Sequence, residues 1–225
     1  MLQAIFYKEW IKTKPIVFVL GIVALALVGY ATLTTTYLFR NEGAVSTWFS
    51  IANGEIQMIP PYMKSFFILS ATVLSAFQYT SEMVNKRFKL TLHLPMKPIS
   101  ILAGLLIYGS GVILLLCVVS LSLLVGCMRV FYPSELIGFA LLDLVPHLLM
   151  CFAAYFFVAW IVLEPIAKRR ITNLLISFAS ITAFLFYGGA PCTLTYAIPS
   201  LIVILFVAFA TSLYATARFK EGAQN

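Results

Sequence analysis

Long apolar stretches, separated by short segments that contain charged residues, Pro or Gly, make up most of the chain. They lie at about 15–39, 61–81, 99–126, 136–163, 172–188 and 198–217. A transmembrane α-helix needs roughly 20 predominantly apolar residues, and these stretches are close to that length or exceed it. The pattern therefore predicts an all-α membrane protein with six transmembrane helices, in a single domain over residues 1–225.

The composition excludes a water-soluble globular protein. Of the 225 residues, 62% are hydrophobic and only 10% are charged, against roughly 45–50% and about 25% in soluble domains. Six spans leave room for short connections only. We therefore expect no soluble catalytic domain within this chain.

The formal charge of +7 is better explained by orientation in the membrane than by nucleic-acid binding. With six spans, 12 of the 15 cations lie on one side of the bilayer, and loops rich in Lys and Arg stay in the cytoplasm. Both termini are therefore predicted to be cytoplasmic. The inner cations are Lys8, Lys12, Lys14, Lys86, Arg87, Lys89, Lys97, Lys168, Arg169, Arg170, Arg218 and Lys220, and the outer ones are Arg40, Lys64 and Arg129.

The sequence does not predict an enzyme. It contains no phosphate-binding loop of the pattern GxxxxGK[ST], so ATP hydrolysis would fall to a partner. The four cysteines have no metal-ligand spacing, and we expect no cofactor or metal in this chain. Gly109-Ser110-Gly111 departs from the serine-hydrolase patterns, and close helix packing by small residues explains it better.

Residues 82–94 form a predicted amphipathic helix between the second and third spans, ended by Pro95. Glu82, Lys86, Lys89 and His93 share one face at helical spacing, whereas Val84, Phe88 and Leu92 share another. One interpretation is a helix that lies on anionic lipid headgroups. The other is a docking helix that inserts its apolar ridge into a cytoplasmic partner.

Residues 1–14 also have a helical pattern, with Leu2, Ile5, Phe6 and Trp10 on one side. Trp10 suits the headgroup boundary. Glu9 falls inside the apolar arc, which is unfavourable for a helix lying on lipid. A lysine or protein partner for Glu9 is one explanation, and snorkelling of its side chain is the other.

The order of these features resembles the permease subunit of type-2 ABC transporters. The matching features are Lys8-Glu9 before the first span, an acid at the inner end of the second, a basic amphipathic stretch ending in Leu94-Pro95, and a cationic tail. The resemblance implies an elbow helix at 1–14 and a coupling helix at about 82–94. It assigns ATPase coupling to Glu9, Glu82, Lys86, Phe88, Lys89, Leu90 and Leu92.

The resemblance also implies partners and a location. A second permease copy or a related permease would complete the membrane part, and each copy would rest on an ABC ATPase subunit that carries ATP and Mg. We expect an exporter in a bacterial plasma membrane. The short outer connection at 189–197 departs from many members of the family. The alternatives are a non-transporting anchor or assembly subunit and an ion-coupled secondary carrier.

Two polar seams are candidates for a translocation path. One seam follows the second span and the other follows the fifth, and each brings its polar and aromatic residues to one side of a helix. The alternative interpretation is that these small polar residues only pack the helices against one another. The seams comprise Ser65, Thr72, Ser75 and Tyr79, and Asn173, Ser177, Ser180, Phe184 and Tyr187.

Asp143 and His147 are four residues apart and share a helical face. An ionisable pair inside a membrane is a functional candidate. If the fourth span begins at Leu136, Asp143 lies roughly 10 Å inward at 1.5 Å per residue. If the span begins at Leu144, which we favour, both residues lie near the outer surface and a proton relay is not expected.

Overall fold

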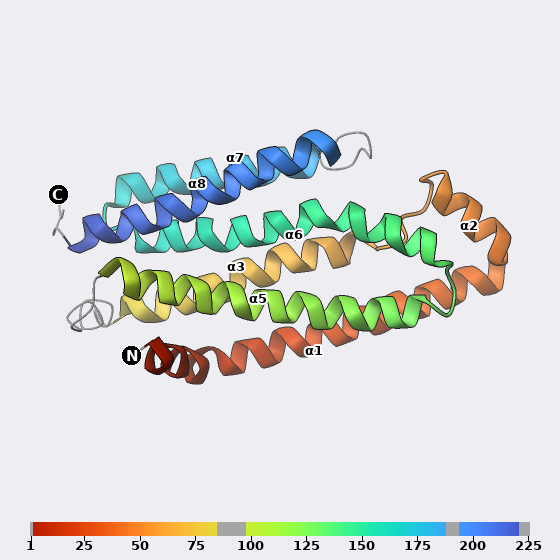
Figure 1. Ribbon diagram of the computed structural model, residues 1–225, viewed down its shortest axis with the longest axis horizontal. Coiled ribbons are helices and arrows are strands. Elements are labelled where there is room, and N and C mark those ends of the chain that lie inside the picture. Colours follow the sequence, from red (N-terminus) through yellow and green to blue (C-terminus); the bar gives the residue numbers. More distant parts are fainter. Residues whose placement is uncertain (1, 85–97, 188–193, 221–225) are drawn as a thin grey trace.

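The computed structural model describes residues 2–84, 98–187 and 194–220 (Figure 1). Each secondary-structure element within these ranges is an α-helix, which confirms the all-α part of the prediction. The helices in chain order are α1 (Leu2–Glu42), α2 (Ala44–Ala52), α3 (Pro61–Met83), α5 (Pro98–Met128), α6 (Ser134–Leu163), α7 (Ala167–Tyr187) and α8 (Leu194–Lys220).

Three of the described helices are both long and apolar enough to cross a membrane. They are α1 over Gln3–Glu42, α5 over Ile99–Met128 and α6 over Ser134–Leu163. The chain is therefore an integral membrane protein. The other three predicted spans coincide with α3, α7 and α8, and α2 is a short helix that the apolar pattern did not predict.

The long helices form an elongated bundle with α6 near its centre, and consecutive long helices run in opposite directions (Figure 1). Helix α6 packs against α3, α7 and α8, while α1 packs against α5 and α3. The beginning of α1 and the end of α8 lie at the same end of the bundle, together with the end of α3 and the beginning of α7. Helix α2 lies at the opposite end.

Helix α1 combines the expected elbow region and the first span in one continuous helix of 41 residues. Pro15 lies inside it and removes one backbone hydrogen bond, which is the usual cause of a bend. Figure 1 shows the first turns of α1 running in a different direction from the rest of the helix. A bend near Pro15 lets these turns lie across the end of the bundle.

Gly and Pro set several of the helix boundaries. Gly43 has a φ of 81°, a left-handed conformation that favours glycine, and it separates α1 from α2. Pro61 is the first residue of α3 and follows Pro60, where its fixed φ and missing N–H fit a helix start. Pro133 likewise precedes α6.

Burial within the bundle separates a packed interior from apolar outer faces. Ala153, Ala154 and Ala159 of α6 are buried, and small residues of this kind let neighbouring helices approach closely. Large apolar side chains remain exposed on the outer faces, as expected where lipid replaces water. Examples are Phe18, Ile22 and Leu25 of α1, Ile171, Leu175 and Phe178 of α7, and Ile202, Val203 and Phe206 of α8.

Candidate functional site

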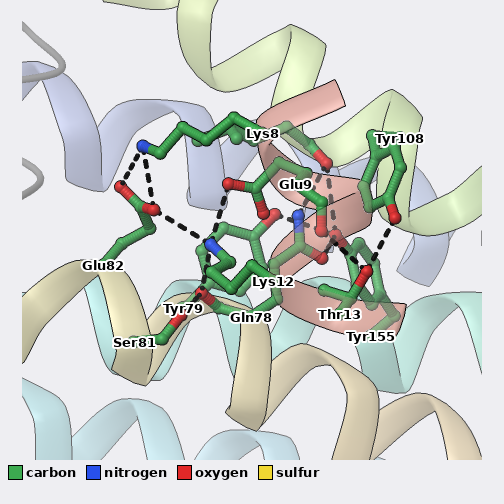
Figure 2. A network of polar contacts seen from close by, with 11 residues as sticks. Lys8, Glu9, Lys12, Thr13, Gln78, Tyr79, Ser81, Glu82, Tyr108 and Tyr155 are labelled. Carbon is green, nitrogen blue, oxygen red and sulfur yellow. Dashed lines mark hydrogen bonds and ion pairs between the residues drawn. The ribbon is translucent and has the colours of Figure 1, made fainter. Parts of the chain in front are cut away.

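A buried group of charged side chains joins the first turns of α1 to the last turn of α3 (Figure 2). We call Lys8, Glu9, Lys12 and Glu82 the ionic cluster. Lys12 Nζ lies 2.8 Å from Glu9 Oε1 and 2.9 Å from Glu82 Oε1. Lys8 Nζ lies 3.0 Å from Glu82 Oε1, so Glu82 is paired with both lysines.

The ionic cluster is shielded from solvent on its acidic side. The side chain of Glu9 is 0% exposed and that of Glu82 is 1% exposed, whereas Lys12 is 15% and Lys8 is 47% exposed. Lys12 also donates to the backbone carbonyl of Gln78 at 3.1 Å. Its three N–H groups therefore bind three acceptors on two helices. Such pairing is required, because an unpaired buried charge is strongly destabilising.

The electrostatic balance at Glu82 favours the ionised carboxylate. Glu82 lies just beyond the predicted span 61–81. Burial has the largest single effect and would raise the pKa of Glu82, but attraction and hydrogen bonds from Lys12 and Lys8 together outweigh it. The pKa of Glu82 is therefore lowered from its ordinary value.

A network of uncharged polar groups lies next to the ionic cluster and connects α3, α5 and α6. The Tyr155 hydroxyl donates to Gln78 Oε1 at 2.9 Å and lies 2.9 Å from the Tyr79 hydroxyl. Gln78 Nε2 donates to the Leu105 carbonyl of α5 at 3.2 Å. We call Gln78, Tyr79 and Tyr155 the tyrosine network, and all three side chains are fully buried.

Two further contacts tie α1 and α6 into the same region. The hydroxyls of Thr13 on α1 and Tyr108 on α5 lie 2.6 Å apart. Ser75 of α3 donates to the Tyr155 carbonyl at 2.8 Å. Four helices are thereby joined by polar contacts at one end of the bundle.

Gly109 gives the tyrosine network its space. A side chain at this position of α5 would overlap the Tyr155 hydroxyl and approach Gln78 Oε1 to 2.6 Å. Around Gly111, by contrast, no atom lies within 4 Å of the place a Cβ would take. The helix-packing interpretation of the Gly109-Ser110-Gly111 segment is therefore confirmed at Gly109.

A second ion pair lies near the opposite end of α3. Lys64 Nζ is 2.6 Å from Asp143 Oδ2 of α6 and 3.2 Å from Gln57 Oε1. The Lys64 side chain is 10% exposed and that of Asp143 is 47% exposed. Helix α3 thus carries paired charges at both ends, Lys64 in its first turn and Glu82 in its last.

The Asp143 carboxylate pairs with Lys64 on a neighbouring helix, while His147 contacts the Asp143 backbone. His147 Nδ1 lies 3.3 Å from the Asp143 carbonyl oxygen. The imidazole ring also packs edge-on against Phe184 of α7, with ring centroids 5.4 Å apart. Asp143 lies level with the first turn of α3, since it reaches Lys64 there.

The seam predicted along the second span separates into two kinds of position. Ser75 and Tyr79 are buried and face α6 through the contacts given above. Ser65 is exposed, and Thr72 donates to the Leu69 carbonyl of its own helix at 2.8 Å. Only the half of the seam nearer to the ionic cluster therefore contacts a neighbouring helix through hydrogen bonds.

The seam along the fifth span, on α7, is buried in part. Asn173, Ser177 and Phe184 are buried. The Asn173 side-chain amide, correctly oriented, accepts from Trp160 Nε1 of α6 at 3.2 Å. Ser177 and Ser180 donate to carbonyls of α7 itself, at 2.7 and 2.9 Å. Both seams therefore have contacts with α6, which lies between α3 and α7; the Tyr187 side chain lies outside the described positions.

Most residues of the predicted coupling helix lie outside the described residues. Lys86, Phe88, Lys89, Leu90 and Leu92 all fall within 85–97. Of the residues assigned to ATPase coupling, the structure describes Glu9 and Glu82, and it brings them into one cluster. The lysine partner that the sequence suggested for Glu9 is confirmed as Lys12.

Several residues of the site were not predicted. Tyr155 lies in an apolar stretch of α6, and no pattern of polar positions in the sequence marked its hydroxyl as part of a site. Lys12 and Lys64 counted only as orientation signals, although an Asp or Glu on another helix neutralises each of them. Gln78 was the one available signal, because a carboxamide deep in an apolar stretch requires hydrogen-bond partners.

No protein-family model, curated protein or solved structure matches this chain. What the protein does must therefore be inferred from its own residues and their geometry.

Proposed function

We propose that this chain is the membrane-spanning permease subunit of a type-2 ABC transporter, acting as an exporter with a second permease and two separate ATPase subunits. The ionic cluster carries the proposal. The Lys8-Glu9 pair and the acid after the second apolar stretch are two of the features that carry the resemblance. Lys8 contacts Glu82 directly, and Lys12 lies between Glu9 and Glu82. In a transporter of this kind, such a contact would join the elbow to the coupling helix.

The position of the cluster gives it a mechanical role in this proposal. Glu82 lies directly before residues 85–97, the segment expected to dock on the ATPase. Because Lys8 and Lys12 hold Glu82, a force on that segment acts on the first turns of α1 and the end of α3 together. The tyrosine network then passes the displacement to α5 and α6 through Gln78 and Tyr155.

The placement of charges supports the proposed orientation. Lys8, Lys12 and Lys14 of α1 and Lys168 to Arg170 of α7 belong to one end of the bundle, at which α8 also ends. Arg40 and Lys64 belong to the other end. With six crossings and the cationic end in the cytoplasm, both termini are cytoplasmic. The ATPase would then approach this end of the bundle, bringing ATP and Mg.

The partly polar, partly aromatic seams on α3 and α7 suit an amphipathic or lipid-like cargo better than a small ion. In the proposed cycle, closure of the ATPases moves α3 and α7. The route between two permease copies then changes from inward to outward access. Ser75 and Ser177 are the positions at which a bulky Trp would block this route.

Purification from the native cell in a mild detergent tests the proposal. We expect a protein with a phosphate-binding loop to co-purify and to hydrolyse ATP. Phe88→Asp should release this partner while the chain still inserts in the membrane. His93→Asp, on the polar face of the same expected helix, is the matched control and should retain the partner.

Other results would replace the proposal. If the purified assembly contains no nucleotide-hydrolysing subunit, the chain is better assigned as an ion-coupled carrier. If an ATPase is present but Trp at Ser75 or Ser177 leaves the activity of the assembly unchanged, the chain is an anchor subunit. Retention of the ATPase by Phe88→Asp would show that the 82–94 segment is not the docking element.

A further inference from the structure

Glu9 has a carboxyl group that is buried and only half satisfied. Its side chain is 0% exposed, and Oε1 accepts a hydrogen bond from Lys12 at 2.8 Å. None of the described residues donates to Oε2. A buried carboxylate that lacks a donor on one oxygen is costly, because ionised oxygens require several hydrogen bonds away from water.

The available positive charge is directed mainly at Glu82. Lys8 binds both oxygens of Glu82, at 3.0 and 3.1 Å, and Lys12 binds Glu82 Oε1 at 2.9 Å. Glu9 shares Lys12 with Glu82 and with the Gln78 carbonyl. When two carboxyl groups share one site, ionisation of the first opposes ionisation of the second. Glu82 is the better-paired group and keeps the negative charge.

The other polar groups that face Glu9 have partners elsewhere. Besides Lys8, Lys12 and Glu82, these are Tyr79 of α3, Tyr108 of α5 and Tyr155 of α6. Tyr108 is bonded to Thr13, and Tyr79 and Tyr155 are bonded to each other, while Tyr155 also donates to Gln78. Figure 2 shows the Glu9 carboxyl in the middle of this group, between Glu82 and Tyr108.

From this geometry we infer that Glu9 is a proton-binding site, occupied at neutral pH while the first turns of α1 rest on α3 and emptied when they separate. The proton comes from water and binds Oε2, and Oε1 remains the acceptor for Lys12. The ionic cluster then carries two ammonium groups and one carboxylate. The cluster then has a net charge of +1, and water can solvate this charge at the half-exposed Lys8.

Proton binding at Glu9 makes the α1–α3 contact sensitive to pH. In the separated state Glu9 is hydrated and ionises above its ordinary pKa of about 4.3. Closing the contact therefore takes up one proton at neutral pH, so closure becomes more favourable as the pH falls. This linkage follows from the ionic cluster alone and does not depend on the proposed transport function.

Infrared spectroscopy of the purified full-length chain at pH 7, in a detergent without ester groups, tests the inference. We expect a carbonyl band from a protonated carboxyl group that is lost in Glu9→Gln. The band should persist in Glu135→Gln, which alters an exposed carboxyl, and in Glu164→Gln, which alters another deeply buried one. Absence of the band from the unaltered chain, or its persistence in Glu9→Gln, would overturn the inference.

Unfolding provides a second measurement, and its first readout uses the unaltered chain alone. On heating through the unfolding transition at pH 7, the carboxyl band of the unaltered chain should disappear, because Glu9 ionises once hydrated. Between pH 5 and 7, Glu9 should contribute a rise of about tenfold per pH unit to the unfolding equilibrium constant, measured as the difference between the unaltered chain and Glu9→Gln. Glu9→Gln should lack this component. A band that survives unfolding would contradict the assignment.

Discussion

Lys12 and Glu82 are separated by 70 residues in the sequence, yet Lys12 Nζ lies 2.9 Å from Glu82 Oε1 where α1 meets α3. The pair fixes the beginning of the first long helix against the end of the second. Helix packing in a membrane cannot rely on the hydrophobic effect, since lipid is as apolar as the side chains. Buried polar contacts therefore have a larger share in specifying which helices meet.

Lys12→Met should destabilise the protein more than any other single lysine substitution in α1. It removes the shared donor of Glu9 and Glu82 and leaves buried carboxyl groups with fewer partners. Breaking a buried pair from one side costs about 3–5 kcal/mol. Thermal unfolding in detergent measures the loss. Lys14→Met, at an exposed position of the same helix, is the control and should change little.

Lys8→Met should have a much smaller effect than Lys12→Met. The Lys8 side chain is 47% exposed, so solvent screens its attraction to Glu82. Pairs of this kind contribute up to about 1 kcal/mol. The same unfolding experiment compares the two variants. Equal losses would mean that the difference in exposure does not govern the strength of these contacts.

Gly109→Ala should disrupt the tyrosine network. The added methyl group would overlap the Tyr155 hydroxyl, and overpacking of a core typically costs about 1–3 kcal/mol. Gly111→Ala has open space and should instead gain up to about 1 kcal/mol from higher helix propensity. Unfolding midpoints should show that Gly109→Ala lowers the stability of the protein and that Gly111→Ala raises it. Equal effects would show that the space around Gly109 is not restricted.

The Lys64–Asp143 pair should respond asymmetrically to substitution. Asp143→Asn leaves the buried Lys64 without its carboxylate, whereas Lys64→Met leaves a half-exposed Asp143 that water can hydrate. The Asp143 variant should therefore lose more stability, by about 1–3 kcal/mol. Transport by Asp143→Asn should keep its rate and pH dependence if the folded protein survives. A shifted pH profile would instead favour a proton relay.

Below about pH 4.3, where Glu9 is protonated whether or not the contact is closed, acidification should weaken the α1–α3 contact through Glu82. The pKa of Glu82 is lowered in the folded chain, so its stabilising effect is present above the unfolded value. That effect disappears as the pH falls from about 4.3 through the folded pKa. Unfolding midpoints measured from pH 5 to pH 3 should decrease in the unaltered chain. In Glu82→Gln this decrease should be smaller.

The helices could be predicted from sequence because apolar stretches and the Pro and Gly residues between them are local signals. Pro61 begins α3, and the apolar run that resumes at Leu144 continues to Leu163, the last residue of α6. The continuity of α1 was not predicted. Pro15 stands between the helical pattern of residues 1–14 and the apolar stretch that follows, and the structure joins these two segments in one bent helix.

The candidate site could be predicted only in outline. Glu9 stood out because a carboxylate within an apolar arc requires a partner, and Glu82 stood out by its position after an apolar stretch. Their contact depends on how α1 and α3 pack, which no local pattern encodes. Tyr155 was missed for a related reason, since its ring satisfies the apolar pattern while its hydroxyl finds partners on α3 and α5.

The paired charges at the two ends of α3 restrict how this helix can move. Lys64 and Glu82 are 18 positions apart, a rise of about 27 Å at 1.5 Å per residue, close to the roughly 30 Å of a bilayer's hydrocarbon core. In the proposed six-span arrangement, sliding α3 along its axis would pull one charged end into hydrocarbon and strain the pairs at both. Tilting or rotating about those anchored ends would not, so α3 is built to pivot and not to act as a piston.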